Sequence, residues 1–221
     1  QLHWGPDPAR FIENEDARVA AAVAAVAPRP VIWVPERFKR ARHLEGPELE
    51  VLAWTALLRG VKGVRCHFWM NNPVAPFADC PGLGEMFSAL DRGIAGLRPV
   101  LSPLIPMGTS EDRPRMTLTY EGWAGDAGVL LLVRNMRYST DGAADDAGRR
   151  PRFRVSAATD VAVAFVPPPW LRRMGTPVDP LTGASYAASR APDGRLSIVL
   201  PRLEAFRLVW IPNADPATLL N

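Results

Sequence analysis

Glu36 is a candidate catalytic residue because of the residues that surround it in the sequence. It comes two residues after the apolar run 30–34, and the cations Arg37, Lys39 and Arg40 follow it closely. Nearby cations favour the ionised form of a carboxyl group, and an ionised carboxylate can act as a nucleophile. The same cluster of opposite charges is equally well explained as a surface ion pair.

Aromatic and amide side chains occur near the same part of the sequence. The candidate substrate-binding residues are Trp33, His67, Trp69, Asn71 and Asn72. An aromatic ring can stack on the apolar face of a sugar, and an amide can hydrogen-bond its hydroxyl groups. Each residue also has a structural alternative. Trp33 and His67 can be packing residues with satisfied hydrogen bonds, and the asparagines can form the turn before Pro73.

A second aromatic group lies in the C-terminal half of the sequence. Trp123, Trp170 and Tyr186 could together form a sugar-binding face. A role in the core or at an interface is the favoured alternative. The three prolines at 167–169 indicate that Trp170 lies at a rigid edge.

No metal or cofactor is expected. The cysteines, Cys66 and Cys80, can form one bridge or remain two buried thiols. Neither cysteine begins a C-x-x-C pair, which argues against zinc. Asp141, Asp145 and Asp146 lack the spacing of an EF-hand loop. The sequence also has no P-loop, dinucleotide fingerprint or nucleophile elbow.

Charge and hydropathy narrow the range of partners. The formal net charge is +3, and acidic and basic residues are interspersed, so nucleic acid is not expected. The longest Ala/Val run, 19–27, is too short to span a bilayer. The sequence begins at Gln1 without a signal peptide, which predicts a processed or excised product.

The elements that would position these side chains follow from the periodicity. Apolar spacing predicts helices over 13–27, 48–59 and 83–97, the second with a single apolar stripe. Short apolar runs at 30–34 and 64–69 predict buried parallel strands between them. The alternation of helix and strand is typical of βαβ units.

Short strands separated by turns dominate the rest of the chain. The predicted strands are 115–120, 129–134, 153–156, 161–166, 196–200 and 205–211. The segment 139–150 is rich in Gly and Asp, which predicts a loop. Turns are predicted at 179–183 and 192–194. This spacing is typical of an antiparallel β-sandwich.

The predicted fold class is therefore α/β followed by all-β, in two domains. The α/β segment takes residues 1–103, a linker takes 104–114, the β-sandwich takes 115–213, and a tail takes 214–221. The linker is inferred from prolines and polar residues where the strand pattern replaces the helix pattern.

Three short motifs carry a resemblance to a known family. They are PVIWVPERF at 30–38, GVKGV at 60–64 and CHFW at 66–69. In this order, around a Leu/Ala helix, they resemble the last two βα units of a (β/α)8-barrel glycoside hydrolase. The helix exit at 97–101 resembles the exit from such a barrel. The turn Thr182-Gly183 and the final strand, Phe206–Ile211, resemble the accessory β-sandwich of these enzymes.

The resemblance implies a role for Glu36 close to that of the nucleophile at the end of the penultimate barrel strand. Such enzymes use two carboxylates across the scissile bond, and the second is expected on an earlier strand that this sequence lacks. A complete barrel takes about 250 residues. We therefore expect the two parallel strands to be the incomplete end of a barrel, which associates with the missing portion or with a second chain. A self-contained βαβ layer is the other option.

The leading functional hypothesis is the C-terminal region of a bacterial glycoside-hydrolase-like protein with a carbohydrate partner. A secreted, periplasmic or cell-envelope location is expected. The chain by itself would lack a complete active site. One alternative is a non-enzymatic carbohydrate- or protein-binding β-sandwich on an α/β scaffold. Another is a structural subunit whose open sheet edge pairs with another chain.

Overall fold

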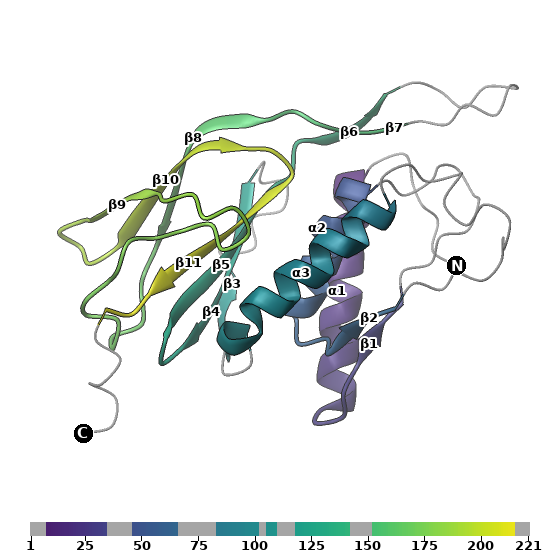
Figure 1. The fold of residues 1–221 in the computed structure, drawn as a ribbon, viewed down its shortest axis with the longest axis horizontal. Coiled ribbons are helices and arrows are strands. Elements are labelled where there is room, and N and C mark those ends of the chain that lie inside the picture. Colours follow the sequence, from purple (N-terminus) through teal and green to yellow (C-terminus); the bar gives the residue numbers. More distant parts are fainter. Residues whose placement is uncertain are drawn as a thin grey trace, which may run out of the picture. The chain divides into compact units, whose positions relative to one another are not determined.

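The computed structural model describes residues 8–34, 46–65, 83–101, 105–109, 118–141 and 152–214. In these ranges, three helices alternate with two short strands and nine further strands follow (Figure 1). The chain forms two compact units. The first comprises residues 1–91 with 137–156, and the second comprises 92–136 with 157–221. The fold is thus mixed, with helices and a parallel strand pair first and antiparallel sheets after them.

The three predicted helices are present, and they are α1 (Pro8–Val26), α2 (Gly46–Leu58) and α3 (Leu83–Leu101). α1 begins with proline, which suits the first turn of a helix because the missing N–H has no helical partner there. The division between the two units falls within α3, between Asp91 and Arg92.

Burial around α2 corrects the prediction of a single apolar stripe. Ten of its thirteen residues are buried, and Trp54 is fully inaccessible. A helix that is apolar on every side is stable only when other elements surround it. α2 is therefore a core helix rather than a surface helix of the first unit.

Strands β1 (Ile32–Trp33) and β2 (Gly63–Val64) pair in parallel on either side of α2 in the sequence. Ile32 lies opposite Gly63, and Trp33 lies opposite Val64. This pair confirms a strand on either side of the second helix, whereas residues 66–69 of the second predicted strand lie outside the described residues. The described residues contain two strands of this sheet, which do not close a barrel.

The second unit contains a four-stranded antiparallel sheet in the order β11-β5-β4-β3. Its strands are β3 (Ile105–Thr109), β4 (Leu118–Gly125), β5 (Gly128–Asn135) and β11 (Phe206–Pro212). Every residue of the central strand β5 is buried, so both faces of the sheet are covered there.

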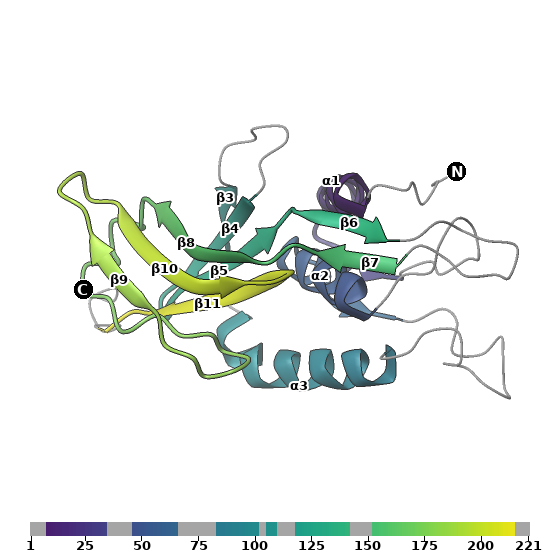
Figure 2. The same ribbon diagram turned by 90° about the horizontal axis from the view of Figure 1, so that it is seen from above.

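A three-stranded antiparallel sheet of the same unit has the order β8-β10-β9 (Figure 2). Its strands are β8 (Ala158–Phe165), β9 (Ala187–Arg190) and β10 (Leu196–Leu203). Buried and exposed residues alternate along the second half of β8, from Val161 to Phe165. The period of two shows that one face of this sheet is packed and the other faces solvent.

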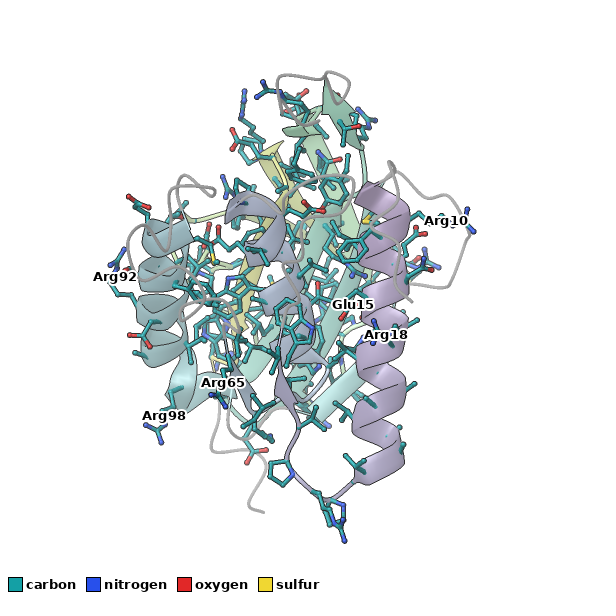
Figure 3. The ribbon with its side chains drawn as sticks, turned by 90° about the vertical axis from the view of Figure 1, so that its right-hand side faces the viewer. Arg10, Glu15, Arg18, Arg65, Arg92 and Arg98 are labelled. Atoms are coloured by element: carbon teal, nitrogen blue, oxygen red, sulfur yellow. The ribbon has the colours of Figure 1, made fainter. Side chains whose placement is uncertain are left out.

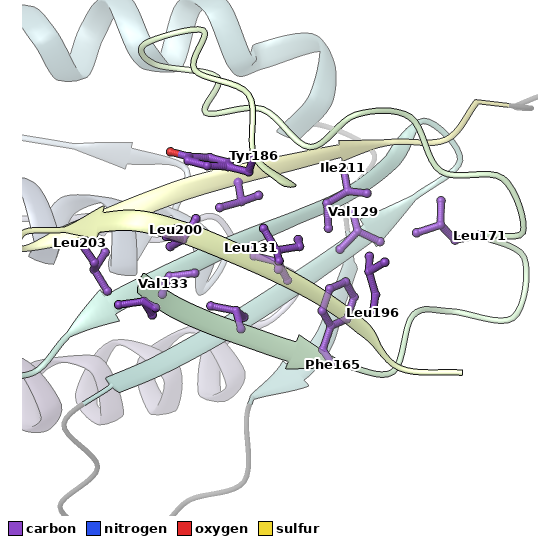
Figure 4. Close-up of a cluster of buried hydrophobic side chains, with 14 of the residues drawn as sticks. Val129, Leu131, Val133, Phe165, Leu171, Tyr186, Leu196, Leu200, Leu203 and Ile211 are labelled. Atoms are coloured by element: carbon purple, nitrogen blue, oxygen red, sulfur yellow. The ribbon is translucent and has the colours of Figure 1, made fainter. Parts of the chain in front are cut away.

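The two sheets share one hydrophobic cluster. Leu131 and Val133 of β5 belong to it together with Leu196 and Leu200 of β10. Figure 4 shows these side chains directed between the sheets, with Leu171 and Tyr186 added from the segment between β8 and β10. Inward-facing residues of both sheets therefore form the core of the second unit.

Two predicted irregular segments contain strands. β3 lies inside the predicted linker and pairs with β4, with a register shift between Pro106 and Gly108. Because β3 is an edge strand with a bulge, the proline costs no essential ladder hydrogen bond. β6 (Tyr138–Asp141) begins just before the predicted loop at 139–150, extends into it and pairs with β7 (Arg152–Val155).

Candidate functional site

The candidate site begins where β1 and β2 end at one edge. Because the strands are parallel, the segments that follow β1 and β2 leave the pair in the same direction. The amide of Arg65 donates to the carbonyl oxygen of Trp33 at 2.9 Å, which extends the ladder to this edge. At the opposite end the amide of Lys62 donates to the carbonyl oxygen of Val31 at 2.8 Å. The carboxyl ends of adjacent parallel strands are where open α/β sheets and barrels place their sites.

Trp33 is held in place by α1. Its side chain is buried, and its Nε1 donates to Oε1 of Glu15 at 3.1 Å. Arg18 pairs with the other carboxylate oxygen of Glu15, also at 3.1 Å. Figure 3 shows Arg10 projecting outward from α1, whereas Glu15 lies on the inner side of the helix. A buried ring with a satisfied N–H packs the strand against the helix and leaves little surface for a sugar to stack on.

The remaining predicted site residues lie outside the described residues. These are Glu36, His67, Trp69, Asn71 and Asn72. Cys66, Cys80, Asp145 and Asp146 also lie outside them. The structure therefore places the strand ends that lead to the predicted site, and the site residues themselves stay predictions.

A partly buried ion pair in the first unit has no counterpart in the sequence prediction. Nε and Nη2 of Arg59 donate to the two carboxylate oxygens of Asp16 at 2.6 and 3.0 Å. The Asp16 side chain is 9% exposed, and the pair ties α1 to the residue that follows α2. The available signal was that Asp16 falls on the buried stripe of α1 between Ile12 and Val19. A charge on a buried stripe requires a partner.

The aromatic group of the second unit does not form an exposed platform. Trp123 is 4% exposed and Tyr186 is 9% exposed, and Tyr186 belongs to the core cluster. Trp170 is partly buried against the same cluster. A buried ring cannot stack on a sugar, so Trp123 and Tyr186 are core residues.

Asp179 organises the turn at 179–183. It is buried, and its Oδ1 accepts hydrogen bonds from the amides of Leu181 and Thr182 at 2.8 and 3.3 Å. Gly183 closes the predicted turn with a φ of 77° and donates to the Asp179 carbonyl oxygen at 2.7 Å. The arrangement explains the turn that the sequence predicts, because the aspartate satisfies the backbone donors that the chain reversal exposes.

Tyr186 and Arg207 complete the surroundings of this carboxylate. Burial raises the pKa of the Tyr186 hydroxyl, and the negative charge of Asp179 raises it further. Nε of Arg207 lies 3.9 Å from Oδ2 of Asp179. The carboxylate is therefore engaged on both oxygens by groups that hold the turn, and we assign the cluster a structural role.

The described residues hold no group of three or more His, Cys, Asp or Glu side chains suited to a metal ion. Asp141, one of the three aspartates of the predicted loop, lies in β6 opposite Arg152. Among the helices of the described part, none combines the length and apolar character needed to cross a membrane.

No family model matches this chain, and no curated protein matches it. Among solved structures, one named glycoside hydrolase aligns with 97% of this chain at 11% sequence identity, with a TM-score of 0.44. This chain spans 50% of the length of that structure.

Proposed function

We propose that this chain is the C-terminal region of a glycoside-hydrolase-like, carbohydrate-active protein. In this proposal the β1–β2 pair contributes side chains that contact the sugar at its carboxyl edge. The two antiparallel sheets of the second unit serve as a bracing β-sandwich. The observation that carries the proposal is the parallel register of β1 and β2, because it directs both strands toward one edge.

The register determines how closely the predicted site residues follow the sheet. Trp33 and Val64 are paired, and Glu36 and His67 each come three residues later in the chain. Three residues span at most about 11 Å of extended chain. In the proposal, this short length of chain lets Glu36 and His67 reach a common edge.

Exposure of the β1–β2 pair supports the view that further strands belong beside it. Trp33 faces α1 and is buried, whereas Ile32 and Val34 are 61% and 40% exposed. Parallel sheets are normally covered on both faces, and two short parallel strands form too small a sheet to be stable alone. In the proposal, the missing strands of the barrel cover this apolar face.

The proposed roles follow from the side-chain chemistry. Glu36 supplies a carboxylate nucleophile, with the second carboxylate contributed by an earlier strand of the completed barrel. Trp69 stacks on a sugar ring, and His67, Asn71 and Asn72 hydrogen-bond its hydroxyl groups. Trp33 positions β1 through Glu15. A secreted or cell-envelope location, where polysaccharides are met, is part of the proposal.

The two ends of β2 provide a matched test. A glycan array with the full-length protein identifies a saccharide, and calorimetry then measures its affinity for two variants. Trp69→Ala, beyond the carboxyl end, should weaken binding by at least about tenfold, equivalent to about 1.4 kcal/mol. Lys62→Gln changes an exposed residue at the amino end and should leave the affinity unchanged. Equal effects of the two variants, or no effect of Trp69→Ala, would contradict the proposal.

A further inference from the structure

A rigid loop of the second unit, residues 167–175, presents arginine side chains beside a partly buried tryptophan. Two turns fix its backbone. The amide of Leu171 donates to the carbonyl oxygen of Pro168 at 3.0 Å, and the amide of Arg172 donates to that of Trp170 at 2.8 Å. Prolines at 167–169 restrict the chain before the turns.

The loop is also anchored on both sides of its arginines. Leu171 is buried in the core cluster (Figure 4), and Trp170 packs against that cluster. The carbonyl oxygen of Arg173 accepts a hydrogen bond from the amide of Ala214 at 2.9 Å, and the amide of Gly175 donates to the carbonyl oxygen of Pro212 at 2.9 Å. The backbone of such a loop is already ordered, so binding a ligand to its side chains costs little further conformational entropy.

The exposed side chains of this loop carry unbalanced positive charge. Arg172 and Arg173 are exposed, and within the described residues no acidic side chain pairs with either. Arg190 of β9 adds a third cation, because its Nη2 donates to the carbonyl oxygen of Leu171 at 3.1 Å. Asp193 of the same hairpin faces another cation, with its Oδ2 3.6 Å from Nε of Arg195.

We propose that Trp170, Arg172, Arg173 and Arg190 form a binding surface for an acidic saccharide, a glycan of the uronate type. Guanidinium groups bind carboxylates through paired hydrogen bonds, and an indole ring offers an apolar face to a sugar ring. That the anionic ligand is a saccharide rests on the proposed function. That the surface binds an anion rests on its guanidinium groups alone.

The experiment measures binding of oligogalacturonate to the full-length protein by calorimetry, with a neutral cello-oligosaccharide of equal length as the comparison. We expect oligogalacturonate to bind and the neutral oligosaccharide not to bind at this surface. Raising the salt concentration should weaken the interaction because the charges are exposed to solvent. The double variant Arg172→Gln/Arg173→Gln should weaken it by at least about tenfold.

A second double variant controls for the loss of two positive charges. Arg18→Gln/Arg202→Gln removes two exposed arginines that are not part of the loop, whose side chains are 55% and 63% exposed, and it should leave the affinity unchanged. Equal weakening by both double variants would overturn the proposal. Failure of oligogalacturonate to bind would overturn it as well.

Two further ligands test whether the surface selects a uronate over other polyanions. A sulfated oligosaccharide of equal length shares the negative charge, and weaker binding than that of oligogalacturonate supports the uronate class. Tighter binding of a single-stranded oligonucleotide than of oligogalacturonate would overturn the proposal. Trp69→Ala should leave oligogalacturonate binding intact, so failure of the strand-end site and failure of this surface give different results.

Discussion

Glu36 is the single residue on which an enzymatic role depends. In the full-length protein, Glu36→Gln should lower kcat for an aryl glycoside by at least about a thousandfold, because the amide cannot act as a nucleophile. The affinity for the intact saccharide should change little, since the two side chains have the same size. Steady-state hydrolysis and calorimetry measure the two quantities. A variant that keeps its hydrolytic rate would assign Glu36 to a surface ion pair.

The raised pKa of Tyr186 predicts how the stability of the protein changes at alkaline pH. Burial, and then the charge of Asp179, raise the pKa of its hydroxyl above the ordinary value of 10.0. The unfolded chain therefore releases this proton first as the pH rises above about 10, and unfolding becomes easier by up to about 1.4 kcal/mol per pH unit. The stabilising contribution is complete below that pH and is lost as the pH rises through the folded-state pKa.

The comparison with Tyr186→Phe isolates this residue. Urea unfolding should show a steeper alkaline loss of stability in the parent protein than in the variant, which has no proton to release at this position. Parallel pH profiles for the two proteins would contradict the assignment.

At the scale of secondary-structure elements, the ion pair of Asp16 and Arg59 joins α1 to the end of α2. Asp16→Asn should lower the free energy of unfolding by about 2–3 kcal/mol, because it removes the charge that faces the partly buried guanidinium of Arg59. Arg18→Gln breaks the more exposed pair with Glu15 and should cost at most about 1 kcal/mol. Urea denaturation distinguishes the two variants, and similar costs would contradict the larger contribution expected of the partly buried pair.

The tight connection between β4 and β5 depends on Gly128. Its φ is 150°, and a Cβ at this position would clash with the carbonyl oxygen of Ile211 on β11. Gly128→Ala should therefore cost more than about 2 kcal/mol. Gly194 has a φ of 86° but open space around it, so Gly194→Ala should cost only about 1–2 kcal/mol. Thermal unfolding measures both costs. A larger cost for Gly194→Ala than for Gly128→Ala would contradict the close approach of β11 to Gly128.

The elements also show what local sequence could predict. Apolar periodicity was sufficient to predict the three helices and β5, because in these elements the residues that pack against a core also favour the same secondary structure locally. It missed β3, where Pro106 and Gly108 are tolerated by an edge strand with a bulge. It missed β9 (Ala187–Arg190), an edge strand of small and polar residues. It also missed the Asp16–Arg59 pair, because the partners are 43 positions apart and only the packing of two helices brings them together.

At the scale of the whole molecule, the sequence predicted a helical α/β part followed by antiparallel strands, and the structure has this order. Periodicity could not assign the β6–β7 hairpin to a unit. Its residues belong with 1–91, although they follow β5 of the second unit in the chain. Such grouping arises from contacts between distant segments, which local patterns do not record. The strand ends of the candidate site were predictable because parallel strands in a βαβ unit share an edge.

Hydrogen–deuterium exchange in the full-length protein tests the central claim most directly. The saccharide identified on the glycan array is added, and protection is measured peptide by peptide. The proposal predicts new protection after the two parallel strands, in peptides covering 34–40 and 65–72. Peptides at the amino end of β2, around Lys62, should be unchanged. Protection confined to the antiparallel sheets, or absent from both strand ends, would contradict a sugar site at the carboxyl edge of β1 and β2.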